Sequence, residues 1–156
     1  MGINWPAMER RGPEIYEADI AAFERRLHAV LPSDYRRFLL EVNGGDLAES
    51  NTRLPHHMVN YLLSLADREN HSCDLEMSAD WAHRVIPHPD LLLIGYTDGG
   101  MILLMLRGDH RGEVWNLDSV DPRPEDANPR VLWHDRRDMM KLADSFEEFV
   151  GKLQPL

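Results

Sequence analysis

Residues 31–45 read LPSDYRRFLLEVNGG, which describes one short helix together with both of its ends. Pro32 suits the first turn of a helix, where its missing N–H costs nothing. The apolar side chains that follow recur at the spacing of one helical face: Tyr35, Phe38, Leu39 and Val42. Asn43, Gly44 and Gly45 come next, and these residue types adopt the positive φ with which many helices end. The stretch therefore predicts an amphipathic helix that closes at Asn43.

Similar patterns predict helices elsewhere. Residues 16–27 place an apolar stripe between charged side chains, at Tyr16, Ile20, Phe23 and Leu27. Residues 75–85 carry a less regular stripe. Ser145 and Glu148 have the spacing of a capping box, in which the Ser145 hydroxyl accepts the Glu148 N–H and the Glu148 side chain bonds back. The stripe of this last helix comprises Phe146, Phe149, Val150 and Leu153.

The middle of the chain predicts strands. Residues 91–94 and 101–106 are apolar on both sides of a pleat, which is typical of central strands covered on both faces. Polar and apolar side chains alternate along residues 113–117, which predicts a third strand with one solvent-exposed face. Because residues 97–100 and 107–112 read as turns, we expect an antiparallel meander. Further strands are expected at residues 131–134 and 139–142, and residues 59–65 fit a strand or a helical turn. Loops are expected at residues 46–57, 67–72 and 118–130.

The whole chain fits one α+β domain. Its 156 residues are the usual size of a single domain, and 43% of them are hydrophobic, as in ordinary globular proteins. We expect a single domain over residues 1–156. Its mostly antiparallel sheet should be flanked by helices near the N-terminus and the C-terminus.

The composition indicates the cellular compartment of the protein and the kind of partner that it can bind. Cys73 is the one cysteine, so no internal disulfide forms, which suits a reducing cytoplasm. Residues 1–11 hold no run of signal-peptide length, and glycines interrupt the most apolar stretch, residues 91–106. The net charge of −10 repels nucleic acid and anionic membranes but attracts basic proteins. We therefore expect a cytoplasmic protein, a monomer or weak dimer, that contacts neither nucleic acid nor membrane. The charge alone is also consistent with a role only in solubility.

No pattern of catalytic or metal-binding residues emerges. His56 and His57 are adjacent and point opposite ways on an extended chain, and His83 and His88 lack the i, i+4 spacing of a metalloprotease pair. Cys73 has no CxxC partner. We expect solvated or capping histidines, with no metal, no cofactor and no catalytic residues.

Acidic residues form two groups in the sequence. The first is Asp67, Glu69, Asp74, Glu76 and Asp80. The second is Asp109, Glu113, Asp118, Asp121, Glu125 and Asp126. Inhibitors of nucleases can present carboxylates to a basic cleft, and a tryptophan among charges suits an interface anchor. The candidate partner-binding residues are Asp67, Glu69, Asp74, Glu76, Asp80, Trp81, Asp118 and Asp121. Trp115 and Trp133 are weaker anchor candidates, and two solvated acidic faces are the alternative.

Four stretches together resemble the SUKH superfamily, the domain shared by bacterial toxin-immunity proteins and a yeast Smi/Knr-type cell-wall regulator. They are residues 20–24 with 31–39, residues 43–45, residues 93–95 with 99–106 and 112–115, and residues 145–149. The resemblance implies an α+β fold with a mostly antiparallel sheet and a non-enzymatic role. It also implies a protein partner, because many members are thought to block a toxin, often a nuclease.

Three hypotheses of function follow. The first is an immunity protein that binds and neutralises a cognate bacterial toxin, with a basic nuclease as the candidate partner. The second is a non-enzymatic scaffold or regulatory protein-interaction module. The third is an enzyme or small-ligand binder, which a cleft lined by converging histidines and carboxylates would favour.

Overall fold

The computed structural model describes residues 3–48, 54, 57–66, 74–83, 85–118 and 132–153, without the side chains of residues 81 and 82. It confirms the α+β class. The strands are β1 (Met8–Arg11), β2 (Gly45–Leu47), β3 (Val59–Leu62), β4 (Leu91–Thr97), β5 (Gly100–Met105), β6 (Val114–Asp118) and β7 (Met139–Ala143). The helices are α1 (Glu17–Leu27), α2 (Ser33–Glu41), α3 (Leu75–Ala82) and α4 (Phe146–Gly151), with a 3₁₀ helix, η4 (Trp133–Asp135).

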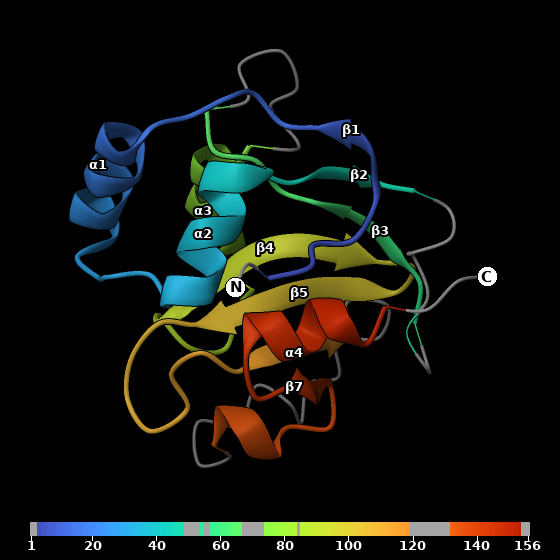
Figure 1. Cartoon of the computed structure of the whole chain (residues 1–156). Coiled ribbons are helices and arrows are strands. Elements are labelled where there is room, and N and C mark those ends of the chain that lie inside the picture. The colour runs from blue at the N-terminus through green and yellow to red at the C-terminus, as the bar shows by residue number, and fades with distance from the viewer. Residues whose placement is uncertain are drawn as a thin grey trace.

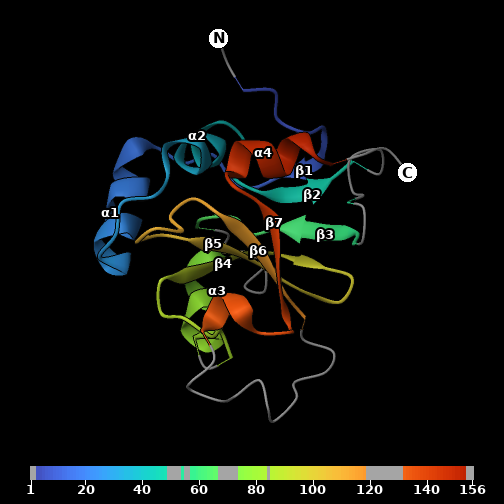
Figure 2. The same cartoon turned by 90° about the horizontal axis from the view of Figure 1, so that it is seen from below.

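The strands form one seven-stranded sheet in the order in which they occur along the chain, and every neighbouring pair is antiparallel (Figure 1). Figure 2 shows α2 and α4 on one side of this sheet and α3 on the other. Strands β4 and β5 are buried along almost their whole length because they lie between these layers. The expected meander is therefore confirmed, and it extends beyond the three expected runs.

Helix α2 has the predicted face and the predicted end. Its apolar side chains are buried, and the Phe38 ring lies 4.9 Å from that of Phe146 in α4, centroid to centroid. The chain then turns through three successive positive φ angles: 59° at Asn43, 70° at Gly44 and 113° at Gly45. A side chain at Gly45 would collide with the Arg10 carbonyl of β1, so the turn also brings two strands into contact.

The N-terminal ends of α1 and α4 differ in detail from the predictions. Ser145 Oγ accepts the Glu148 N–H at 3.0 Å, as expected, but Glu148 Oε2 accepts the N–H of Asp144, at 3.3 Å, and not that of Ser145. Tyr16 is 64% exposed because it is the N-cap of α1 and precedes the buried stripe. The stripe itself is confirmed by the burial of Ile20 and Phe23.

Three strand predictions were wrong. Gly45–Leu47 forms β2 where residues 46–57 were expected to be a loop, because it pairs with both β1 and β3. Strand β6 has no solvent-exposed face over Val114–Leu117, because all four residues are buried and Asn116 is only 2% exposed. The Asn116 amide oxygen accepts the Thr97 hydroxyl at 2.9 Å, which satisfies this buried polar group. In place of the strand at residues 131–134, the described residues show η4 (Trp133–Asp135).

Candidate functional site

The described members of the first acidic group lie on α3 or next to its start, and their environments differ. Asp74 is 7% exposed and caps the helix: its carboxylate accepts the Met77 N–H and its carbonyl accepts the Ser78 N–H, both at 3.0 Å. Glu76 forms an ion pair with Arg26 that joins α3 to α1. Asp80 is exposed and has no polar partner among the described residues. Asp67, Glu69 and the Trp81 side chain lie outside the described part of the chain.

The second acidic group does not form one surface. Glu113 precedes β6 and Asp118 ends it, so about 17 Å of strand separates the two residues. The Glu113 carboxylate accepts Trp115 Nε1–H at 3.0 Å, and it also faces His110 Nδ1 at 2.9 Å and Lys141 Nζ at 3.6 Å. Glu113 is therefore used within the fold. Asp118 is exposed at the other end of the strand, and Asp121 lies outside the described residues.

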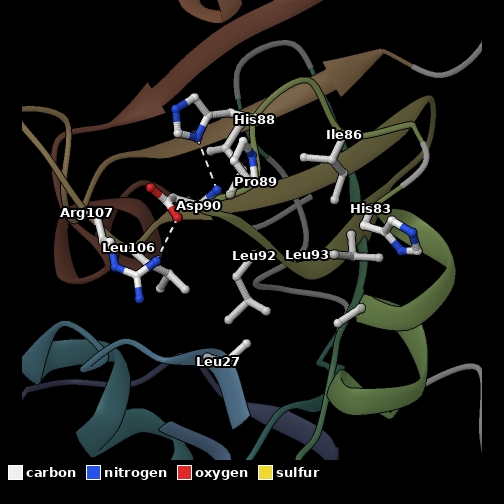
Figure 3. Close-up of a pocket in the computed structure, with 12 residues that line it drawn as sticks. Leu27, His83, Ile86, His88, Pro89, Asp90, Leu92, Leu93, Leu106 and Arg107 are labelled. Carbon is white, nitrogen blue, oxygen red and sulfur yellow. Dashed lines mark hydrogen bonds and ion pairs between the residues drawn. The ribbon is translucent and has the colours of Figure 1, made fainter. Parts of the chain in front are cut away.

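A surface pocket of about 200 Å³ opens beside α3. The two acidic groups in the sequence do not predict it. It lies between the end of α1, the α3 helix, the start of β4 and the residue that follows β5 (Figure 3). Its apolar lining consists of Leu27, Ala79, Ile86, Pro89, Leu91, Leu92, Leu93 and Leu106. Figure 3 shows Leu27, Leu92 and Leu93 around the hollow.

The polar groups at the rim of this pocket are largely engaged with one another. Arg107 forms an ion pair with Asp90 at 2.8 Å, and His88 Nδ1 accepts the Asp90 N–H at 3.1 Å. His83, the residue that follows α3, lies on another side of the pocket (Figure 3). The Arg26–Glu76 ion pair joins α1 and α3 one residue before Leu27 and one turn before Ala79.

The pocket does bring two histidines and a carboxylate together, the arrangement that would favour the third hypothesis. However, the Asp90 carboxylate is held by Arg107, and most of the lining is apolar. Within the described ranges, no group of three or more His, Cys, Asp or Glu side chains is placed to hold a metal ion. Contact with an apolar group is the interaction that this lining supports best.

The two weaker tryptophan candidates belong to a different cluster. Trp115 is buried in β6, and its ring lies 4.9 Å from that of Trp133 in η4. His110 and His134 lie beside Trp133, with ring centroids at 5.3 and 5.2 Å. Packing inside the fold accounts for Trp115, and Trp133 is partly buried on top of it.

The sequence of the chain matches a known protein family. The family model described as the SMI1 / KNR4 family (SUKH-1) matches residues 14–152. The chain belongs to this family. No curated protein matches it at a significant level. The matched range holds every described helix and strand except β1.

SUKH-1 membership bears directly on the class of function. The family is associated with toxin immunity, and its domains are generally immunity proteins that pair with toxins, not enzymes. None of the helices in the described part of the chain has both the length and the apolar character needed to cross a membrane.

Sequence reasoning missed the pocket for a physical reason. Leu27 follows the stripe of α1 and so predicts a core residue, while Ala79 and Ile86 carry no distinctive signal. Tertiary packing brings these residues together from two helices and the loop after α3. The nearest signal was the pair His83 and His88, which the sequence predicts to be solvated or capping.

Proposed function

We propose that this SUKH-1 protein is an immunity protein that binds a cognate toxin and neutralises it in the cytoplasm of the cell that makes both. The observation that carries the proposal is the family match over residues 14–152, because the family is associated with toxin immunity. The net charge of −10 supports a basic partner, and a nuclease with a cationic cleft is our candidate.

The surface around α3 is our proposed contact region. Asp80 is exposed, and the side chain of Glu76 is 35% exposed, so both carboxylates are accessible to a basic partner. Asp67, Glu69 and Trp81 belong to the same stretch of sequence and remain proposed contacts. Asp74 contributes indirectly by capping α3. A standard interface covers roughly 800 Å² of each partner, so it would extend beyond this one helix.

Asp118 and Asp121 form a second proposed region. Asp118 ends β6, next to the turn between β4 and β5, whereas α3 packs against β4 from one face of the sheet. The two regions would help chiefly by increasing the rate of encounter, since electrostatic steering raises association rates by ~10–1000-fold at low salt. Either region alone would be enough to steer a basic partner towards the protein.

Co-expression provides the functional test. The product of the gene immediately upstream is expressed alone and together with this protein, and growth is followed. We expect arrest with the neighbour alone, recovery with both, and a stable complex on purification. A harmless neighbour, or a toxic one that this protein neither binds nor neutralises, would contradict the immunity function. The regulatory interaction module would then become the better hypothesis.

A further inference from the structure

The size of the pocket between α1 and α3 indicates what it accepts. Sites for drug-sized ligands usually measure about 300–1,000 Å³, whereas an apolar cavity of about 150 Å³ accommodates a single benzene ring. At about 200 Å³ the pocket has room for one large apolar side chain. Its volume therefore favours an anchor residue of a protein partner over a free metabolite.

The lining supports the same conclusion. Leu92 and Leu93 come from the start of β4, a buried central strand, so they form a rigid part of the wall. Leu27 and Ala79 belong to helices that the Arg26–Glu76 ion pair joins. A preformed hollow of this kind binds at a lower entropic cost than one that must first be ordered.

The charged groups near the pocket indicate which type of residue the partner would place next to the apolar side chain that enters it. On the rim, Arg107 is neutralised by Asp90. Asp80 follows Ala79 on α3 and so lies about 100° around the helix from a residue that lines the pocket. Because Asp80 has no polar partner among the described residues, its carboxylate is available to a cation on the partner.

We propose that the pocket is an anchor site that receives one large apolar side chain from a partner segment in which a nearby Lys or Arg pairs with Asp80. That this partner is the toxin rests on the proposed function. The apolar side chain supplies most of the affinity, as buried anchors do at other interfaces, and the ion pair to Asp80 sets the register of the segment.

Ala79→Leu tests the pocket directly because the added isopropyl group fills the hollow. Ala22→Leu is the matched control: it makes the same change on α1, at a partly buried position that does not line the pocket. Ala79→Met, with a more flexible side chain, replaces Ala79→Leu if that variant fails to fold. Circular dichroism and the melting temperature establish that each variant is folded.

A phage-displayed library of random twelve-residue peptides serves as a probe that does not depend on the toxin. We expect peptides selected on the full chain to share one large apolar residue with a Lys or Arg close by. They should bind Ala22→Leu normally but bind Ala79→Leu at least about 30-fold more weakly, the loss typical of a hot spot. Failure to enrich such peptides, or equal binding to both variants, would overturn the anchor site.

The toxin, once identified by growth arrest, allows the two proposals to be separated. Ala79→Leu should weaken the toxin complex by at least about 30-fold and Ala22→Leu by less than about threefold. If the toxin binds Ala79→Leu as tightly as it binds the natural chain, the anchor site is wrong while the immunity function stands. If only the peptides bind, the anchor site stands and the immunity function is wrong.

Discussion

Asn43 and the backbone of Leu65 exchange two hydrogen bonds: Asn43 Nδ2 donates to the Leu65 carbonyl at 2.9 Å, and Asn43 Oδ1 accepts the Leu65 N–H at 2.8 Å. The same amide donates to the carbonyl of Pro13 at 2.7 Å. Asn43 is 2% exposed and has a φ of 59°. The residue that ends α2 therefore also holds the segments before α1 and after β3.

Two substitutions of Asn43 distinguish the contribution of its hydrogen bonds to stability from that of its backbone conformation. Asn43→Ala should lower the free energy of unfolding by about 3–4 kcal/mol, because three hydrogen bonds of roughly 1 kcal/mol each are lost and alanine is strained at this φ by about 1 kcal/mol. Asn43→Gly tolerates the φ and should lose about 1 kcal/mol less. Urea unfolding measures both variants. A loss below about 1 kcal/mol for Asn43→Ala would contradict the role of the side chain.

Tyr35 offers a substitution that should stabilise the protein. Its hydroxyl is buried with no hydrogen-bond partner among the described residues, and burial raises the pKa of Tyr35 well above its ordinary value. Because an unsatisfied buried hydroxyl costs roughly 1–3 kcal/mol, Tyr35→Phe should raise the free energy of unfolding by about 1 kcal/mol. Phe38→Ala, on the same helix, is the control and should lose about 3–5 kcal/mol. Destabilisation by Tyr35→Phe would show that the hydroxyl has a partner.

Local patterns predicted the helices well because their signals depend on neighbouring residues. The stripe of α2 and the Asn43 closure both lie within one stretch of fifteen residues, 31–45. The solvent-exposed face predicted for residues 113–117 is wrong because Asn116 is buried beside Thr97 of β4, a contact across the sheet that the alternation along one strand does not report. Strand β1, with its charged Glu9 and Arg10, showed no apolar alternation because it lies at the edge of the sheet.

The candidate site was less predictable than the fold. A run of acidic residues in the sequence does not show which carboxylates form contacts within the protein itself. Asp74 caps α3, and Glu113 accepts a hydrogen bond from Trp115. The pocket depends on the approach of α1 to α3, which no local pattern reports. Asp80 is exposed on α3 and stays a predicted partner contact.

The ion pair between Lys141 and Asp144 should make stability depend on pH. The hydrogen bond from Lys141, and then its charge, hold the pKa of Asp144 below its ordinary value. A lowered pKa contributes stability above the unfolded value of about 3.9, and that contribution is lost as the pH falls through the folded value. Asp144→Asn should therefore melt at a lower temperature than the natural chain at neutral pH.

The difference in melting temperature between the natural chain and Asp144→Asn, followed against pH, tests the direction of this effect. It should be complete above about pH 5 and should close as the pH falls below about 4. Salt should narrow it at neutral pH because both groups are exposed. A gap that widens on acidification would contradict this account of the pair.

Asp80 and Asp74 should respond differently to charge reversal. Asp80→Lys should slow association with the toxin severalfold at low ionic strength, with little effect near 1 M salt and no change in melting temperature, because Asp80 is exposed. Asp74→Lys should lower the melting temperature because it removes the cap of α3. Stopped-flow association and thermal melts measure the two effects. Equal association rates for Asp80→Lys and the natural chain at every salt concentration would remove Asp80 from the interface.

The central claim is that this protein acts by binding a toxin and not by catalysis, and a titration of toxin activity tests it most directly. A fixed amount of purified toxin is mixed with increasing amounts of this protein, and the remaining toxin activity is measured. We predict a linear fall to zero at a fixed molar ratio, with a Kd of roughly 10 nM or tighter, about −11 kcal/mol. Loss of toxin activity at amounts far below that ratio, or full activity in a large excess of the protein, would contradict the claim.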